Sequence, residues 1–242
     1  ARDVKDWKPD TPLELTPANT LGYPEPLGEL EPGTYVAQAV IDLNRWAPDM
    51  FTAKGNGISE PMGFVYKAGE SPTIELKICY NIPGDEHDDT PDLKWVEKRS
   101  DLLSKFYGRD VFLRATVSLP SNYEDDPKRT YPTVYMIPGF DGSVDGDFAR
   151  FFAQMMSAAG LEAVLVQLDA TCPTGHHVFA DSANNGPWGK ALVTEFIPYL
   201  EKQFRLTPFA SARFLMGHSS GGWSSLWLQI TYPDEFGGTW ST

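Results

Sequence analysis

The residues best suited to do chemistry lie in the stretch RFLMGHSSGG, at positions 213–222. Its centre has the pattern Gly-x-Ser-x-Gly, with Gly217 and Gly221 on either side of Ser219. A serine hydroxyl is a poor nucleophile unless the chain presents it and a base removes its proton. Glycines at these two positions let a strand and a helix meet in a very tight turn, because neither carries a side chain. The pattern therefore predicts that Ser219 is a catalytic nucleophile.

An attack by Ser219 creates a negative oxygen, which needs hydrogen-bond donors. Ser219 is expected to begin a helix, and the free N–H groups and dipole of a helix start favour negative charge. The N–H of Ser220 is the predicted first donor. The second is expected in the loop IPGFDGS at 137–143, where Phe140 and Asp141 are both candidates. Alternatively the serine is idle in a glycine-rich turn, and Ser220 rivals it by adjacency only.

A catalytic serine of this kind also needs an acid and a base, in the chain order Ser, Asp or Glu, His. No histidine follows Ser219, and the acids after it are Asp234 and Glu235. Both come at the end of the helix that follows the serine, so neither is a good candidate for the acid. His218 adjoins the nucleophile, but consecutive residues of a tight turn point apart. We expect His218 to pack or orient the turn, with a role as base as the alternative.

A second group of candidate residues follows a buried strand that ends near Asp169. It comprises His176, His177 and Trp188, in the segment TCPTGHHVFADSANNGPW. Ligands bind at the carboxyl edge of a parallel sheet, so these side chains are candidates for the walls of a substrate pocket. The alternatives are a histidine pair held by the local backbone, either histidine as base, and core packing for Trp188.

The elements that position these residues alternate between strands and helices from about residue 106. Apolar runs that predict strands begin at Val111, Pro132, Glu162 and Arg213. Helical spacing predicts helices over 147–160, over 187–204 with a kink at Pro198, and from about 223 to Pro233. This alternation predicts a mostly parallel sheet with helices on both faces. The final residues, GGTWST, are interpreted as the start of a further strand.

The N-terminal part has a different pattern. Residues 1–33 carry a proline every few positions and are expected to run extended. Short β-like runs separated by Gly, Pro and Asn follow over 34–105, typical of a small antiparallel sandwich. The third part, 106–242, is the predicted α/β domain. Cys79 and Cys172 fall in different predicted domains, which favours two buried thiols over a disulfide.

Composition narrows the class of protein. The chain has 242 residues, of which 41% are hydrophobic, enough for one large or two smaller domains. A net charge of -13 argues against nucleic acid or an anionic membrane surface as partner. No apolar run approaches the length of a membrane span. The acidity, the seven Trp and the twenty Pro fit a secreted or periplasmic enzyme. The first residue is Ala1 rather than Met, which fits either removal of a signal peptide or an arbitrary start of the sequence.

Three segments carry a resemblance to a known family: YPTVYMIPGFDGS, PWGKALVTEFIPYLEKQFR and RFLMGHSSGGWSSLWLQITYPDEFGG. They resemble the esterase D-like family of α/β-hydrolases, which includes feruloyl and acetyl-xylan esterases, S-formylglutathione hydrolase, mycolyltransferases and enterochelin esterases. The resemblance covers most of 106–242 and implies the α/β-hydrolase fold. It also implies hydrolysis or transfer of a small-molecule or carbohydrate-linked acyl ester, with no metal and no organic cofactor. A β-domain ahead of the catalytic domain is similar to the arrangement of the enterochelin esterase group.

The hypothesis we favour is a serine esterase whose acid and base lie beyond residue 242, on a continuation of the chain or on another polypeptide. One alternative is a non-catalytic binding or scaffold module that keeps the fold without the triad. Another is an acyltransferase or a serine peptidase. A half-finished final strand leaves an open sheet edge and exposed apolar faces, so residues 1–242 alone are expected to be unstable or aggregated.

Overall fold

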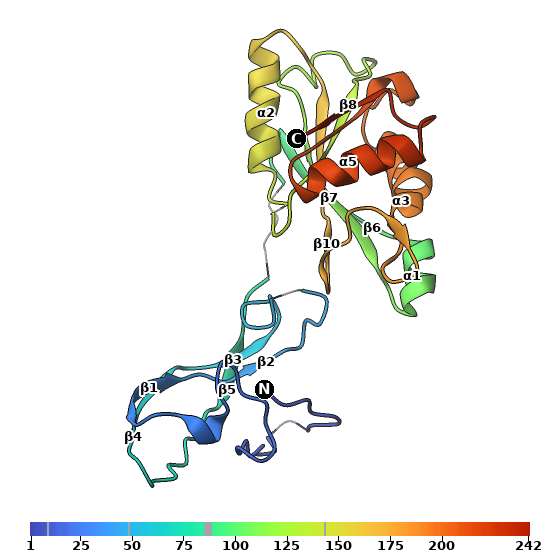
Figure 1. The fold of residues 1–242 in the computed structure, drawn as a ribbon. Helices are drawn as coiled ribbons and strands as arrows, with labels where there is room; N and C mark the ends of the chain where they lie inside the picture. Colours follow the sequence, from blue (N-terminus) through green and yellow to red (C-terminus); the bar gives the residue numbers. More distant parts are fainter. Residues whose placement is uncertain (9, 48, 85–88, 143) are drawn as a thin grey trace. The chain divides into compact units, whose positions relative to one another are not determined.

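The computed structural model describes residues 1–8, 10–47, 49–84, 89–142 and 144–242. The chain divides into two compact units, which Figure 1 shows as ribbons. The N-terminal unit comprises 1–43 and 54–83, and the C-terminal unit comprises 44–53 and 84–242. We predicted the division after residue 105. The structure places it near residue 84, because a strand at 93–99 pairs within the sheet of the C-terminal unit.

The central sheet of the C-terminal unit has six strands in the order β15-β14-β8-β9-β7-β6. The first four lie parallel to one another, and β7 pairs antiparallel with both β9 and β6. The predicted, mostly parallel sheet is therefore confirmed, and GGTWST does contribute a strand. The bounds are β6 (Leu93–Arg99), β7 (Phe112–Ser118), β8 (Thr133–Ile137), β9 (Val164–Leu168), β14 (Arg213–Gly217) and β15 (Gly238–Ser241).

Both faces of this sheet are covered by helices, as the alternating pattern predicted. Along β8, Val134 and Met136 pack in a small cluster with α2 (Asp147–Ala158). Tyr135 and Ile137, which point the other way, belong to the large hydrophobic core. Figure 1 shows α2 on one side of the sheet and α5 (Ser220–Thr231) on the other. The central strands β8 and β9 are buried on both faces because their alternating side chains meet a helix layer on each side, whereas Phe214 of β14 and Trp240 of β15 are exposed.

The helix predicted over 187–204 has three parts. They are α3 (Trp188–Ala191), a π-helical turn η2 (Leu192–Phe196) and α4 (Ile197–Gln203). The N–H of Ile197 donates to the carbonyl of Leu192, which is the wide spacing of a π turn. Pro198 follows directly and has no N–H to offer, so the irregularity lies at the predicted kink.

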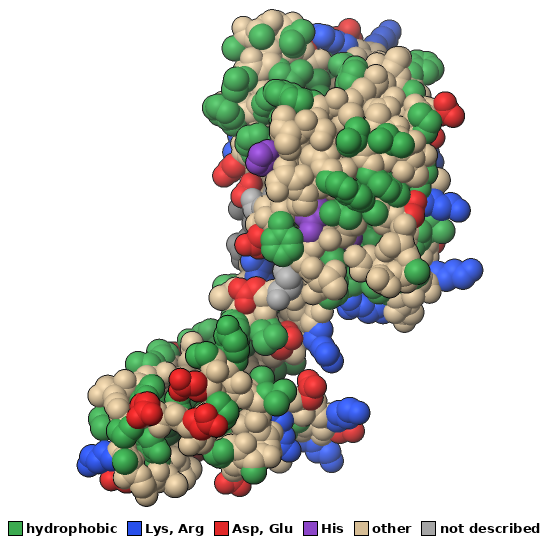
Figure 2. Space-filling view, in the orientation of Figure 1, with side chains coloured by type: hydrophobic (Ala, Val, Ile, Leu, Met, Phe, Trp, Pro, Cys, Tyr) green, Lys and Arg blue, Asp and Glu red, His purple; other side chains and the backbone are tan. Residues whose placement is uncertain are grey.

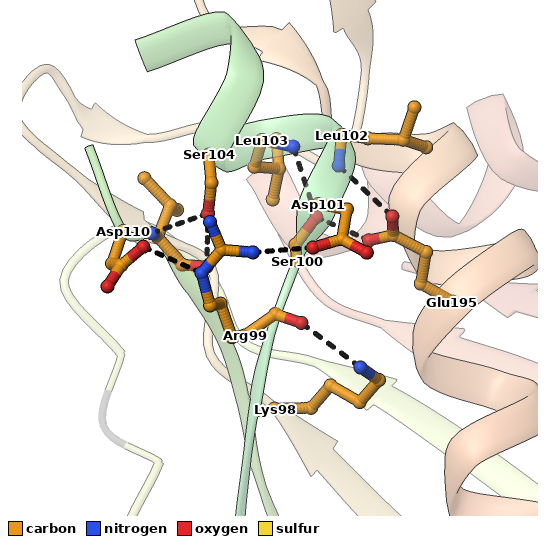
Figure 3. A network of polar contacts seen from close by, with 10 residues as sticks. Lys98, Arg99, Ser100, Asp101, Leu102, Leu103, Ser104, Asp110 and Glu195 are labelled. Atoms are coloured by element: carbon orange, nitrogen blue, oxygen red, sulfur yellow. Dashed lines mark hydrogen bonds and ion pairs between the residues drawn. The ribbon is translucent and has the colours of Figure 1, made fainter. Parts of the chain in front are cut away.

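The π turn carries Glu195, which ties this helix to α1 (Asp101–Tyr107), as Figure 3 shows. The carboxylate of Glu195 accepts from the hydroxyl of Ser100 and, at 3.0 Å, from the N–H of Leu102. The same hydroxyl accepts from the N–H of Leu103 at 3.1 Å and so caps the helix. Because the first N–H groups of a helix have no internal partner, these contacts anchor the start of α1.

Two short hairpins separate β9 from α3. The first pairs β10 (Thr171–Cys172) with β11 (Gly175–His176), and the second pairs β12 (Asp181–Ser182) with β13 (Gly186–Pro187). The short helix η3 (Ala210–Ala212) precedes β14. In the described part of the chain, no helix combines the length and the apolar character that a bilayer crossing requires.

The N-terminal unit is β-rich, as predicted, but lacks a packed core in its described residues. It pairs β1 (Gly33–Ala37) with β4 (Met62–Tyr66), and it joins β2 (Val40–Ile41), β3 (Gly57–Ser59) and β5 (Ile78–Asn81) in an antiparallel sheet. Neither cluster of buried hydrophobic residues includes a residue of this unit, so the core that a sandwich needs is not seen here. The predicted extended segment contains one short helix, η1 (Leu27–Glu29).

The two cysteines are free, in agreement with the prediction of no disulfide. Cys172 is buried, as predicted, but the prediction that Cys79 is buried is wrong, because Cys79 is exposed. It lies in β5, three of whose four residues are exposed, and the sequence alternation did not show which face of that short strand meets solvent.

Candidate active site

Ser219 lies at the turn between β14 and α5, with φ 57° and ψ −124°. Residues other than glycine rarely adopt positive φ, and such a backbone costs about 1–3 kcal/mol. Two backbone hydrogen bonds hold the turn: the N–H of Ser219 donates to Thr242 at 2.8 Å, and that of Gly221 donates to His218 at 2.9 Å. Ser219 is exposed, so the strained turn presents this residue at the surface.

The glycines around Ser219 lie where no side chain fits. A Cβ on Gly217 would lie 2.1 Å from the carbonyl oxygen of Gly221, and a Cβ on Gly221 would lie 2.1 Å from that of Ile137. These neighbours are backbone atoms and cannot move aside alone. The close approach of strand and helix that the glycine spacing predicted is therefore present.

The loop after β8 comes against the same turn. A Cβ on Gly139 would lie 3.5 Å from the Cβ of Ser219. The loop then makes a turn in which the N–H of Gly142 donates to Gly139 at 3.0 Å, with Asp141 at φ 60°. Phe140 and Asp141, the two donor candidates, are the central residues of this turn.

The N–H groups of Phe140, Asp141 and Ser220 have no hydrogen-bond partner among the described residues. Ser220 is the first residue of α5, where a helix leaves its N–H groups without internal partners. These three N–H groups are thus open to a ligand oxygen, close to Ser219 in the chain or in space.

His176 contacts the same loop with both ring nitrogens engaged. Nε2 lies 2.9 Å from the carbonyl oxygen of Pro138, and Nδ1 accepts from the N–H of Val178 at 3.0 Å. Burial lowers the pKa of His176, opposed by the bond to Pro138 and by Asp169. We predicted His176 as a pocket wall or a base. The structure places its ring against the backbone, which agrees with the alternative of a locally held histidine, and the prediction of a pocket wall stays a prediction.

His177 and Trp188 lie in the core and not on the wall of an open pocket, which corrects the pocket prediction for both. They are 1% and 2% exposed, and their rings stack with centroids 3.6 Å apart and planes 6° apart. The Nδ1 of His177 accepts from the N–H of Phe179 at 3.1 Å. Complete burial holds the pKa of His177 well below its ordinary value. Because His177 and Trp188 follow the end of a strand, the sequence placed them at the carboxyl edge of the sheet. It did not show in which direction their side chains point.

The other candidates for acid and base do not meet Ser219. The Nδ1 of His218 lies 3.3 Å from the hydroxyl of Thr242. Glu235 pairs with Arg213 at 2.8 Å, and Arg213 is the first residue of β14, whereas Ser219 follows its last residue. Within the described ranges, no histidine and no carboxylate is hydrogen-bonded to the hydroxyl of Ser219.

Some contacts of this site could not be predicted from the sequence. Gly175 has φ +100°, and a Cβ there would lie 2.3 Å from the ring of Phe140. Only the glycine before the histidine pair hinted at this approach. Among the residues that the structure describes, no group of three or more His, Cys, Asp or Glu side chains is arranged to hold a metal ion.

A comparison with protein families gives one family model, named Esterase, which matches residues 110–241, more than half of the chain. No curated protein sequence matches the chain.

Solved structures are similar to the chain over less than two thirds of their own length. A ferulic acid esterase has 21% sequence identity and a TM-score of 0.51, over 62% of this chain and 58% of that one. A CE1 ferulic acid esterase from Anaeromyces mucronatus has 20% identity and a TM-score of 0.47, over 65% and 60%. An S-formylglutathione hydrolase from Agrobacterium tumefaciens has 20% identity and a TM-score of 0.46, over 61% and 56%. The first of these likenesses shows the α/β-hydrolase fold.

Proposed function

The chain belongs to the Esterase family, and we propose that it is the nucleophile-bearing part of a serine esterase that hydrolyses a carboxylic acyl ester. The observation that carries this proposal is the backbone of Ser219, at φ 57° and ψ −124° between a parallel strand and a helix. Strain of this size persists only where the surrounding structure over-determines it, and it is concentrated at functional sites. This supports the assignment of the turn as a nucleophile elbow.

In the proposed reaction the hydroxyl oxygen of Ser219 attacks the carbonyl carbon of the ester while a base takes the hydroxyl proton. The carbonyl oxygen becomes negative in the tetrahedral intermediate. The C–O bond to the alcohol then breaks, the alcohol leaves with the proton, and an acyl-serine remains. Water repeats the attack on the acyl-serine and releases the acid.

We propose that the N–H groups of Ser220 and Phe140 form the oxyanion hole. Support comes from their lack of partners among the described residues and from the approach of Gly139, the residue before Phe140, to Ser219. The dipole of α5 adds to this stabilisation, because its N-terminal end carries partial positive charge. Asp141, next in the turn, is the alternative to Phe140.

We further propose that the triad base and acid lie beyond residue 242. Support comes from the engagement of the described histidines elsewhere: His176 with Pro138 and Val178, His177 in the core, and His218 beside Thr242. In this fold the acid and the histidine follow the serine in chain order.

The proposed substrate is an ester of a small molecule or of a carbohydrate-linked acid. The name of the structural relative with a TM-score of 0.51, a ferulic acid esterase, supports an ester of a small organic acid. Secretion or a periplasmic location remains a prediction from composition.

Hydrolysis of p-nitrophenyl acetate by the full-length protein and its variants tests the proposal. Ser219→Ala is expected to lower kcat by about 10³-fold or more, because the nucleophile is lost. Ser220→Ala keeps the backbone N–H and is expected to lower kcat far less than Ser219→Ala does. The comparison decides which of the two adjacent serines is the nucleophile. Ser121→Ala, an exposed serine in the loop after β7, serves as the control. Undiminished turnover by Ser219→Ala would exclude Ser219 as nucleophile.

A further inference from the structure

His176 makes a hydrogen bond whose direction the structure fixes. Its Nδ1 accepts from the N–H of Val178 at 3.0 Å, so the ring proton of a neutral imidazole lies on Nε2. Nε2 therefore donates to the carbonyl of Pro138, 2.9 Å away. Both nitrogens are used, and neither is available to take a proton from a substrate.

The carbonyl of Pro138 has no partner in the strand ladder. The last residue of β8 is Ile137, which is paired with Gly217, and the chain leaves the sheet at Pro138. The carbonyl faces the first turn of α5, since a Cβ on Gly221 would lie 2.6 Å from its oxygen. A backbone carbonyl outside the strand ladder needs another hydrogen-bond donor, and the ring of His176 supplies it.

This bond acts on the loop that we assign to the oxyanion hole. The peptide between Pro138 and Gly139 is planar, so a fixed carbonyl at Pro138 also fixes the direction in which Gly139 continues. Gly139 lies beside Ser219, and its own carbonyl accepts from Gly142 at 3.0 Å to close the turn. Phe140 is the second residue of that turn, so the turn sets the direction of its N–H.

The hairpin that carries His176 touches the loop a second time. Gly175 in β11 has φ +100°, and its missing side chain leaves room for the ring of Phe140, 2.3 Å from where a Cβ would be. The hairpin thus contacts the residues immediately before and after Gly139. Two contacts on either side of one residue restrict the loop more than a single bond does.

From this geometry we propose that His176 is a positioning residue of the esterase reaction, which holds the loop of the second oxyanion donor against Ser219 through the carbonyl of Pro138. The proposal rests on the proposed function. The proposed role requires a neutral imidazole at His176, because a proton on Nδ1 would remove the acceptor of the Val178 N–H. Burial, which lowers the pKa of His176, favours that neutral state against the opposing influence of Asp169.

Two substitutions of His176 separate its two hydrogen bonds. His176→Asn places an amide group near the position of Nδ1 and keeps the contact with Val178, but it does not reach Pro138. His176→Gln places an N–H group near the position of Nε2 and keeps the donor to Pro138. In the full-length protein, His176→Asn is expected to lower kcat for p-nitrophenyl acetate by about tenfold, less than the loss of an oxyanion donor itself, with KM changed by less than about threefold. His176→Gln is expected to retain kcat within about threefold.

Hydrogen exchange gives a readout that does not need activity. Exchange of the amides at 139–142, followed by mass spectrometry, is expected to be faster in His176→Asn than in wild type and unchanged in His176→Gln. Equal kcat and equal exchange in the two variants would overturn the proposal. If Ser219→Ala retains activity, the proposed function fails, while the exchange experiment still decides whether His176 holds the loop.

Discussion

Single residues of this chain combine strain with close packing at the point where the proposed chemistry occurs. Ser219 has positive φ, and Gly217 and Gly221 lie against backbone atoms that leave no room for a side chain. Such a backbone is stable only because its neighbours fix it. The Gly-x-Ser-x-Gly pattern therefore predicted the tight turn. The residues that pack against it, Thr242 and Pro138, could be identified only from the structure.

His177 is the residue whose titration is expected to limit stability in acid. Its pKa lies well below the ordinary value of 6.5, chiefly because burial disfavours the charged ring. Below pH 6.5 the unfolded chain binds a proton that the folded chain does not, so the free energy of unfolding falls as pH falls. The slope of this loss grows as the unfolded chain becomes protonated below pH 6.5, and the loss ends when the folded ring also takes up a proton.

Urea denaturation of the full-length protein between pH 7 and pH 5 measures this dependence. His177→Gln lacks the titrating ring, so the slope of its unfolding free energy over this range is expected to be smaller. An unchanged slope in the variant would contradict the assignment of acid sensitivity to His177.

At the scale of elements, the helical segment 188–203 contacts both α1 and the histidine pair. Glu195, on the π turn, binds the start of α1, and Trp188, at the start of α3, stacks on His177. His177 adjoins His176, whose Nε2 lies 2.9 Å from the carbonyl oxygen of Pro138 in the loop after β8. The helical segment 188–203 is thus tied to α1 at its π turn, and its first residue packs against the segment that follows the β10–β11 hairpin.

The tie between α1 and the π turn can be measured by a double-mutant cycle with Ser100→Ala and Glu195→Gln. Ser100→Ala is expected to lower the free energy of unfolding by about 1 kcal/mol, the usual cost of a lost helix cap. The two changes together are expected to cost less than the sum of the single costs, by about 0.5 kcal/mol or more, because they share one hydrogen bond. Strict additivity in urea denaturation would show that the contact contributes nothing.

The elements that sequence predicted well are those with long apolar runs or helical spacing. β8, β9, β14, α2 and α5 lie where their patterns placed them, because burial on one or two faces determines the pattern. The hairpins between β9 and α3 have strands of two residues, too short for any periodicity. The directions of His176, His177 and Trp188 depend on those hairpins and so could not be predicted.

At the scale of the whole molecule, large apolar side chains gather on the surface over α2 and α5, as Figure 2 shows. On α2, Phe148, Phe151 and Met155 are each more than half exposed. On α5, Trp223 is 52% and Ile230 is 70% exposed. Contiguous exposed apolar surface marks interaction sites or aggregation liabilities. In the described parts of the chain, α2 and α5 therefore each expose an apolar face to solvent.

Residues 1–242 as a separate polypeptide are expected to bind a hydrophobic dye such as ANS and to self-associate. Phe151→Lys combined with Ile230→Lys, on α2 and α5, is expected to reduce both effects, because each change replaces an exposed apolar side chain with a charge. Phe106→Lys, on an exposed position of α1, is the matched control. A monomeric wild-type chain that melts sharply and does not bind the dye would contradict this account.

The central claim, that Ser219 is the activated nucleophile of a serine esterase, is tested most directly by covalent labelling. A fluorophosphonate reacts with a serine that a base has activated and leaves a phosphonyl group of known mass on its oxygen. Intact mass and peptide mapping of the labelled full-length protein are predicted to show one phosphonyl group, located on Ser219 and absent from Ser219→Ala. Labelling of another serine, or no labelling of a folded full-length protein, would contradict the account.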